Sequence, residues 1–191
     1  LYDIAWLLNV RGGDISYVPV VLSYLALSQD SCIWFLQEEV VTETLKAYLD
    51  KNGIQTRPYD DFYEYVKHID EKETVLLNTS IVNYRICDSL SKGVKVIDAE
   101  DPTVVMKAVK NEVQLENLRK AHLKDAVAMC RFMYWLKTNI GKIPMTEISA
   151  SDYLASLRAQ QEGFLDLSFA TICGYADHGA IVHYSATEES D

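Results

Sequence analysis

The four histidines are the side chains of this sequence best suited to chemistry, because histidine exchanges protons near neutral pH and commonly binds metals. They differ in their surroundings. His68 follows Lys67 on a predicted surface helix, which favours a solvated or packing role. His122 falls on the apolar face of a longer predicted helix, which favours a hydrogen-bonded core histidine over a metal ligand. The sequence therefore favours structural roles for both residues.

The other two histidines, His178 and His183, lie in a segment of predicted loop and strand. His178 falls in the loop, where a functional role is not favoured. A strand is predicted over 180–184, and its alternation places His183 on one face with Ile181 and Ser185. A polar ring in an apolar strand needs a partner, so His183 is the strongest functional candidate. A structural histidine with a hydrogen-bond partner is the alternative.

Complete motifs for metal or cofactor binding are missing from the sequence. It contains no HExxH, no paired histidines on one helix face and no closely spaced carboxylates on a predicted strand. It also contains no GxSxG, GxGxxG or phosphate-binding loop. Lys107, Lys110 and Lys120 could form a basic patch, but Glu112 and Glu116 interleave with them, which favours a salt-bridged, solvated face. The residues alone predict no metal ligand.

The first half of the chain is predicted to consist of strands followed by alternating helices and strands. Strands are predicted over 4–10, 18–27 and 32–41, the last two joined by a hairpin turn at 29–31. Further helices and strands then alternate. The predicted helices are 42–49, 60–69 and 80–90, and the predicted strands are 74–77 and 94–97. This order predicts an α/β layer.

The pattern changes at Asp101-Pro102, where a domain boundary is predicted between residues 1–102 and 103–191. One long amphipathic helix is predicted from Leu115, and Gly141 ends it. The next helix is expected to start with a capping box between Ser149 and Asp152. Two strands are then predicted at 168–173 and 180–184, joined by a hairpin loop.

Composition excludes some classes of partner. The formal net charge is -10 and the acidic residues are spread along the chain, so a nucleic-acid partner is not expected. No apolar run approaches the ~20 residues of a membrane span, and no leader precedes Leu1. The four cysteines form no CxxC pair, which favours buried free thiols in a reducing compartment, and a cytoplasmic location is expected. Both ends read as cut ends.

Nine short stretches carry a resemblance that covers nearly the whole chain. They are DIAWLLN at 3–9, RG at 11–12, AVKNE at 108–112, RKAH at 119–122, DAVA at 125–128, TEISA at 146–150, QQEGF at 160–164, LSF at 167–169 and GAIVHY at 179–184. Their order and spacing resemble the three-domain branch of the Xaa-Pro aminopeptidases, within the creatinase and prolidase superfamily. Each stretch alone is a weak signal, but the set is specific.

The resemblance implies a fold in two parts. Residues 1–102 would be a creatinase N-terminal-type α/β domain, the middle domain of the enzyme without its start. Residues 103–191 would be the first part of an α+β pita-bread catalytic domain. The chain is thus expected to be an internal fragment, inactive by itself and poorly stable in its second half, where the long helix would lack part of the sheet that covers its apolar face.

The resemblance also implies the chemistry. The full enzyme would use two divalent metal ions, with manganese expected, to remove the residue that precedes a proline in second position. The metal ligands of the full enzyme, two Asp, one His and two Glu, would follow the GAIVHY stretch, and Asp191 is too early to be one of them. The fragment itself would bind no metal and contain no catalytic residue. His183 would line the substrate pocket as a substrate-binding residue.

Several alternatives remain open within this interpretation. Prolidase and creatinase are competing activities in the same superfamily. A non-catalytic pita-bread interaction protein, similar to the peptidase-like domains of histone chaperones, is an alternative of a different class. The expected partner of the full-length enzyme is a peptide with proline in second position, and a homodimer is expected.

Overall fold

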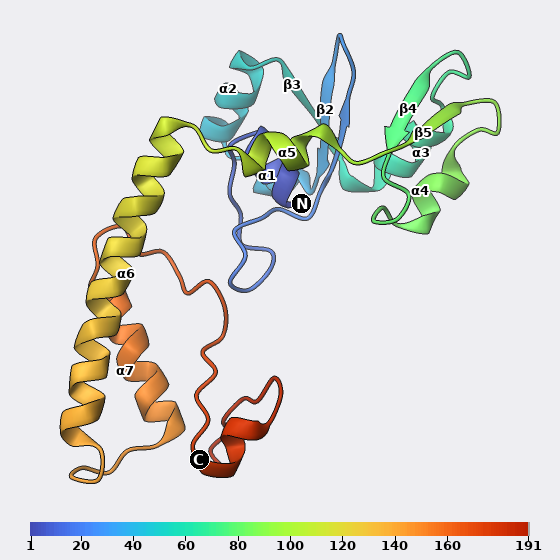
Figure 1. Ribbon diagram of the computed structural model, residues 1–191. Coiled ribbons are helices and arrows are strands. Elements are labelled where there is room, and N and C mark those ends of the chain that lie inside the picture. The colour runs from blue at the N-terminus through green and yellow to red at the C-terminus, as the bar shows by residue number, and fades with distance from the viewer. Residues whose placement is uncertain (191) are drawn as a thin grey trace. The chain divides into compact units, whose positions relative to one another are not determined.

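The computed structural model describes residues 1–190, so Asp191, which is not expected to bind a metal, lies outside the described residues. It divides into two compact units (Figure 1). Unit 1 comprises Leu1–Ile15 and Pro19–Val109, and unit 2 comprises Ser16–Val18 with the residues from Lys110 onward. Helices and strands are mixed, which confirms the predicted fold class. The domain boundary at residue 102 stays a prediction.

Unit 1 contains a three-stranded sheet in the order β1-β2-β3. Strands β1 (Tyr24–Leu27) and β2 (Cys32–Leu36) form the predicted antiparallel hairpin, and β3 (Ile54–Pro58), which was not predicted, pairs with β2 in parallel. Helix α2 (Glu43–Lys51) makes the crossover between them. Thr42 caps it and Gly53, with a φ of 68°, follows its end, both as predicted.

A second, two-stranded parallel sheet lies later in unit 1. It pairs β4 (Thr74–Leu77) with β5 (Lys95–Asp98), close to the predicted strands. The predicted helices around them are present but shorter. From residue 38 onward, the other helical elements of unit 1 are η1 (Glu38–Val40), η2 (Tyr59–Asp61), α3 (Phe62–Lys67), α4 (Tyr84–Ser89) and α5 (Pro102–Ala108).

Strand β2 carries the core of unit 1 on both faces. Trp34 and Leu36 are fully buried in one cluster, against Leu49 of α2. Ile33 and Phe35 point into a second cluster with residues of α3 and α4. Successive side chains of a strand alternate between faces, so a central strand with two covered faces must be apolar at every position. The run CIWFL satisfies this requirement.

The predicted strand over 4–10 is wrong, because this segment forms helix α1 (Tyr2–Leu7). Ala5 and Leu8 are buried, and Ile4 packs against the same cluster as Leu8. Residues spaced by three or four lie on one face of a helix, and the apolar run satisfies this spacing as well as the alternation of a strand. Periodicity cannot separate the two structures in a short, continuously apolar run.

Unit 2 is built on two helices that lie side by side, α6 (Glu112–Asn139) and α7 (Glu147–Ala159) (Figure 1). The predicted long helix is confirmed. Trp135 of α6 stacks on Tyr153 of α7, with ring centroids 4.1 Å apart, and Arg158 Nε lies 2.7 Å from Asp125 Oδ1. Much of the predicted apolar face of α6 is nevertheless exposed. No helix of residues 1–190 has the length and apolar character needed to cross a membrane.

The predicted capping box of α7 is displaced by one turn. The Thr146 hydroxyl accepts a hydrogen bond from the backbone N–H of Ser149, and the Ser149 hydroxyl accepts one from the backbone N–H of Thr146, so these two residues form the box in place of Ser149 and Asp152. The shift starts the helix at Glu147. A glutamate in the first turn also interacts favourably with the positive end of the helix dipole.

The strands predicted at 168–173 and 180–184 are not formed. The described backbone there is irregular except for a 3-10 helix, η3 (Ala176–Ala180). For the second predicted strand the physical reason is a set of polar contacts from Tyr175 and Tyr184 to Glu147, which hold residues 175–184 against the start of α7 in place of a hairpin ladder.

Candidate functional site

A buried carboxylate organises the C-terminal part of unit 2. The side chain of Glu147 is 6% exposed, although it lies in the first turn of α7. A buried charged group is strongly unfavourable unless hydrogen-bond donors replace the water that it has lost. Glu147 must therefore be matched by donors from elsewhere in the fold.

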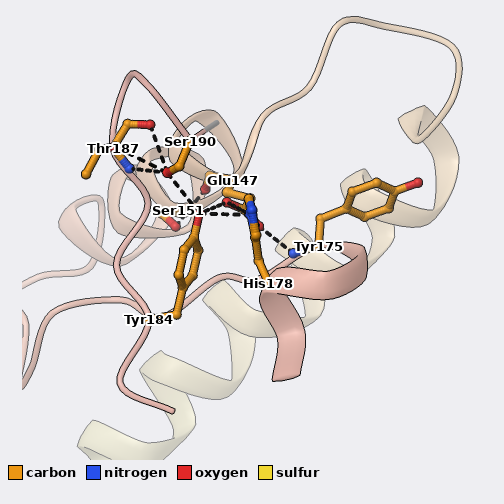
Figure 2. A network of polar contacts seen from close by, with 7 residues as sticks. All are labelled: Glu147, Ser151, Tyr175, His178, Tyr184, Thr187 and Ser190. Carbon is orange, nitrogen blue, oxygen red and sulfur yellow. Dashed lines mark hydrogen bonds and ion pairs between the residues drawn. The ribbon is translucent and has the colours of Figure 1, made fainter. Parts of the chain in front are cut away.

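Three donors from the segment that follows α7 surround this carboxylate (Figure 2). The Tyr184 hydroxyl donates to Oε2 at 2.6 Å, and the backbone N–H of Tyr175 donates to Oε1. Nδ1 of His178 lies 3.1 Å from both carboxylate oxygens. We call Glu147, Tyr175, His178 and Tyr184 the Glu147 network.

The geometry assigns a proton to Nδ1 of His178. An ionised carboxylate only accepts hydrogen bonds, so an Nδ1 at 3.1 Å from both oxygens of Glu147 must donate. The Tyr184 hydroxyl gives its single proton to Glu147, so its oxygen can accept from His178 Nδ1 at 2.9 Å and from Ser190 Oγ at 3.1 Å. Each polar group thus has a consistent role.

Hydrogen bonding keeps Glu147 ionised. The hydrogen bond from Tyr184 lowers the pKa of the Glu147 carboxyl most, and the Tyr175 N–H and His178 lower it further, while burial acts in the opposite direction. The balance places the pKa below its usual value. The network is therefore an anionic centre with fixed donors at neutral pH.

The structure places His183 in an exposed turn beside this network. Its φ is 56°, in the left-handed region, and it does not belong to a strand as the sequence predicted. The next residue, Tyr184, is 8% exposed and holds Glu147. A cavity of about 280 Å³ is lined by Ser151 and by Ser185, but not by His183. The substrate-binding role of His183 stays a prediction.

Sequence reasoning missed most of the network. The sequence favours a loop role for His178, but Nδ1 of this residue lies 3.1 Å from Oε1 of Glu147, and neither Glu147 nor Tyr184 stands out as a candidate. Both belong to stretches of the family resemblance, TEISA and GAIVHY, and that was the available signal. Nothing in the spacing indicates that residues 37 positions apart meet.

The other two histidines, His68 and His122, lie outside the Glu147 network. His68 is exposed, as predicted, and its Nδ1 lies 2.8 Å from the Glu64 carbonyl oxygen. The prediction of a core position for His122 is wrong, because this residue is exposed on α6. The apolar face that should have buried it is itself largely uncovered: Leu118 is 43% exposed and Met133 is 47% exposed.

The residues present do not fit a metal centre. In the part of the chain that the structure describes, no group of three or more His, Cys, Asp or Glu side chains could hold a metal ion. The network offers one carboxylate and one imidazole, and the donors Tyr175 and Tyr184 already occupy the carboxylate. A two-metal site needs several carboxylate or imidazole ligands, so the described residues support no catalytic step through a metal.

The family comparisons cover both units. The creatinase/prolidase N-terminal domain matches residues 1–114, and the metallopeptidase family M24 matches residues 116–190. A probable Xaa-Pro aminopeptidase P of Sordaria macrospora is 34% identical, over 96% of this chain and 32% of its own length. Xaa-Pro aminopeptidase 1 of Dictyostelium discoideum is also 34% identical, over 98% of this chain and 30% of its own length.

A solved structure is also similar to this chain over its whole length. The X-prolyl aminopeptidase of Caenorhabditis elegans, a cytosolic enzyme with a di-nuclear active site, superposes on the whole chain with a TM-score of 0.93 at 30% identity. This chain covers 32% of that one, and it spans about a third of the length of the curated relatives. The resemblance predicted from the sequence is confirmed. The chain belongs to the creatinase/prolidase N-terminal domain family and continues into a domain of metallopeptidase family M24.

Proposed function

We propose that this chain is part of a metal-dependent Xaa-Pro aminopeptidase, which removes the N-terminal residue from peptides with proline in second position. The observation that carries the proposal is the superposition of the whole chain on the C. elegans X-prolyl aminopeptidase at a TM-score of 0.93. The names of the curated relatives, which extend over both units, support the same activity. We call the longer enzyme that would contain this chain the parent enzyme.

The proposal divides the chemistry between this chain and the rest of the parent enzyme. Two divalent metal ions, which we expect to be manganese, would be held by residues outside this chain. They would activate water for attack on the peptide bond. The di-nuclear site of the C. elegans relative supports two ions. This chain would supply His183, which would donate a hydrogen bond to the substrate or to the oxyanion that develops on its carbonyl.

The proposal extends to organisation and location. Residues 1–102 would form the middle domain of the parent enzyme, and residues 103–191 would begin its catalytic domain. The parent enzyme would be a cytoplasmic homodimer, and the cytosolic location of the C. elegans relative supports this location.

The test is an assay of the purified parent enzyme with matched peptides. We expect cleavage of an Xaa-Pro-Yaa tripeptide before proline, no cleavage of the matching Xaa-Ala-Yaa tripeptide, and loss of activity with a chelator that added manganese restores. Cleavage of only the Xaa-Pro dipeptide would instead identify a prolidase. No hydrolysis of any of these peptides would refute the proposed activity and leave a non-catalytic interaction protein.

A further inference from the structure

We propose that Glu147 is a positioning residue that holds the segment 175–184 in the shape in which His183 meets the substrate. This inference rests on the proposed function, because it takes His183 as the substrate-binding residue. Its structural part, an anchor formed by one carboxylate, depends only on the Glu147 network.

The anchor holds the segment near both of its ends. Glu147 accepts the backbone N–H of Tyr175 at the start and the hydroxyl of Tyr184 at the end, and it binds His178 between them. One side chain thus closes the segment into a loop. Three separate donors on one carboxylate restrict the loop far more than a single hydrogen bond would, because each additional contact removes further backbone freedom.

Backbone strain occurs next to the two anchored ends. Ala176 has a φ of 50° and His183 a φ of 56°, in the left-handed region that residues with a Cβ avoid. Ala176 follows Tyr175, and His183 precedes Tyr184. Such conformations persist only where the surrounding structure enforces them, and they concentrate at functional sites. The Glu147 contacts adjoin both residues and can enforce both conformations.

The helix that carries Glu147 is held by an N-terminal cap and by core contacts. Helix α7 begins with the capping box of Thr146 and Ser149, and it buries Leu154 and Leu157. A side chain in its first turn therefore has a fixed origin. A displacement of about 1 Å in a substrate contact can lower the reaction rate about 10²-fold. The fixed position of Glu147 on α7 therefore matters for His183, because Glu147 holds the next residue, Tyr184.

Glu147 itself is not expected to touch the substrate. Its side chain is 6% exposed, and both carboxylate oxygens already accept hydrogen bonds within the chain. A group enclosed in this way can act on the reaction through Tyr184 and His183, but it cannot reach the reacting atoms. This distinguishes a positioning role from a catalytic one and determines what an experiment must measure.

The first arm of the test measures the anchor in the parent enzyme, independently of activity. Hydrogen exchange of the segment 175–184 is followed by mass spectrometry in wild type, Glu147→Ala and Ser151→Ala. Ser151 lies on the same helix and bonds the Glu147 backbone carbonyl, so it is the matched control. We expect at least about 10-fold faster exchange in Glu147→Ala only. Unchanged exchange would overturn the anchor.

The second arm measures kcat and KM for an Xaa-Pro-Yaa peptide in a double-mutant cycle. We expect Glu147→Gln to lower kcat/KM about 10-fold or more, and Glu147→Gln with His183→Ala to be no worse than His183→Ala within about 2-fold. Two residues that act as one unit are non-additive in this way. Multiplicative losses would show that Glu147 acts on stability or elsewhere, and would overturn the positioning role.

A third variant and the wild-type enzyme distinguish failure of the Glu147 inference from failure of the proposed function. If Glu147→Ala does not fold, Tyr184→Phe, which removes one donor and keeps the ring, must show the same faster exchange and the same non-additivity, or the inference fails. If wild-type enzyme cleaves no Xaa-Pro peptide, the proposed function is refuted by that result alone. The exchange arm would still decide whether Glu147 anchors the segment.

Discussion

The Tyr184 hydroxyl lies 2.6 Å from Oε2 of Glu147, although 37 positions separate the two residues in the sequence. The contact connects the end of the GAIVHY stretch to the first turn of α7. It therefore links two stretches of the family resemblance through one hydrogen bond to a charged group. The backbone position of His183 depends on this link, because Tyr184 is the next residue.

Replacing Tyr184 with phenylalanine tests the strength of this link. A hydrogen bond to a charged group contributes about 1.5 to 3 kcal/mol, so Tyr184→Phe should lower the free energy of unfolding by that amount. Urea denaturation of the 191-residue chain measures it. The matched control is Tyr175→Phe, because Tyr175 binds Glu147 through its backbone and the residue is 75% exposed. The control should change stability by less than about 0.5 kcal/mol, and equal losses in both variants would contradict the assignment.

The lowered pKa of Glu147 predicts how stability depends on pH. A carboxyl whose pKa is lower in the folded than in the unfolded chain adds stability above its unfolded pKa, which is 4.5 here. That stability is lost as the pH falls through the lower, folded pKa. Wild type should therefore lose more stability than Glu147→Gln on acidification from about pH 5 to pH 3.

Chemical denaturation at a series of pH values measures this difference. Glu64 and Asp98 also have lowered pKa values, through hydrogen bonds from Lys67 and Thr79. Both groups are present in wild type and in Glu147→Gln, so their effects cancel in the comparison. Parallel stability curves for the two proteins across this range would show that Glu147 is not the anionic centre of the network.

Substitution of His183 tests the proposed substrate contact. In the parent enzyme, His183→Ala should keep the full metal content but lose about 10² to 10³ in kcat, the effect of removing one oxyanion donor. Steady-state kinetics with an Xaa-Pro-Yaa peptide and metal analysis of the same sample measure both quantities. His68→Ala is the matched control, because His68 is exposed at the end of α3 and should leave turnover unchanged. Unchanged turnover in His183→Ala would remove this residue from the site.

Local signals in the sequence predicted much of unit 1. The hairpin of β1 and β2, the Thr42 cap and the Gly53 stop each depend on a few neighbouring residues, and each was found. The strand predicted over 4–10 was wrong, because an apolar run fits a buried helix or a buried strand, and only its packing against the cluster of Trp34 and Leu49 decides between them.

The candidate site was less accessible to sequence reasoning. The family resemblance selects His183, but the strand that should present it is absent, and Tyr184 binds Glu147 where a strand was expected. Alternating apolar residues indicate a strand only where another strand can pair with it, and Ile181 and Val182 are exposed in the structure. A contact between α7 and a loop depends on tertiary packing, which periodicity does not encode.

The distribution of buried side chains predicts that unit 2 opens before unit 1. Both large apolar clusters lie in unit 1, whereas Ala128 is the buried residue of α6 and Leu123 on the same helix is 68% exposed. Opening free energy follows local burial. In the 191-residue chain, amide hydrogens of α6 should therefore exchange at least about 10-fold faster than those of β2. Mass spectrometry of the two segments measures this, with β1, whose Leu27 is 63% exposed, as an edge-strand reference within unit 1. Equal protection of α6 and β2 would mean that the exposed apolar face of α6 is covered in solution.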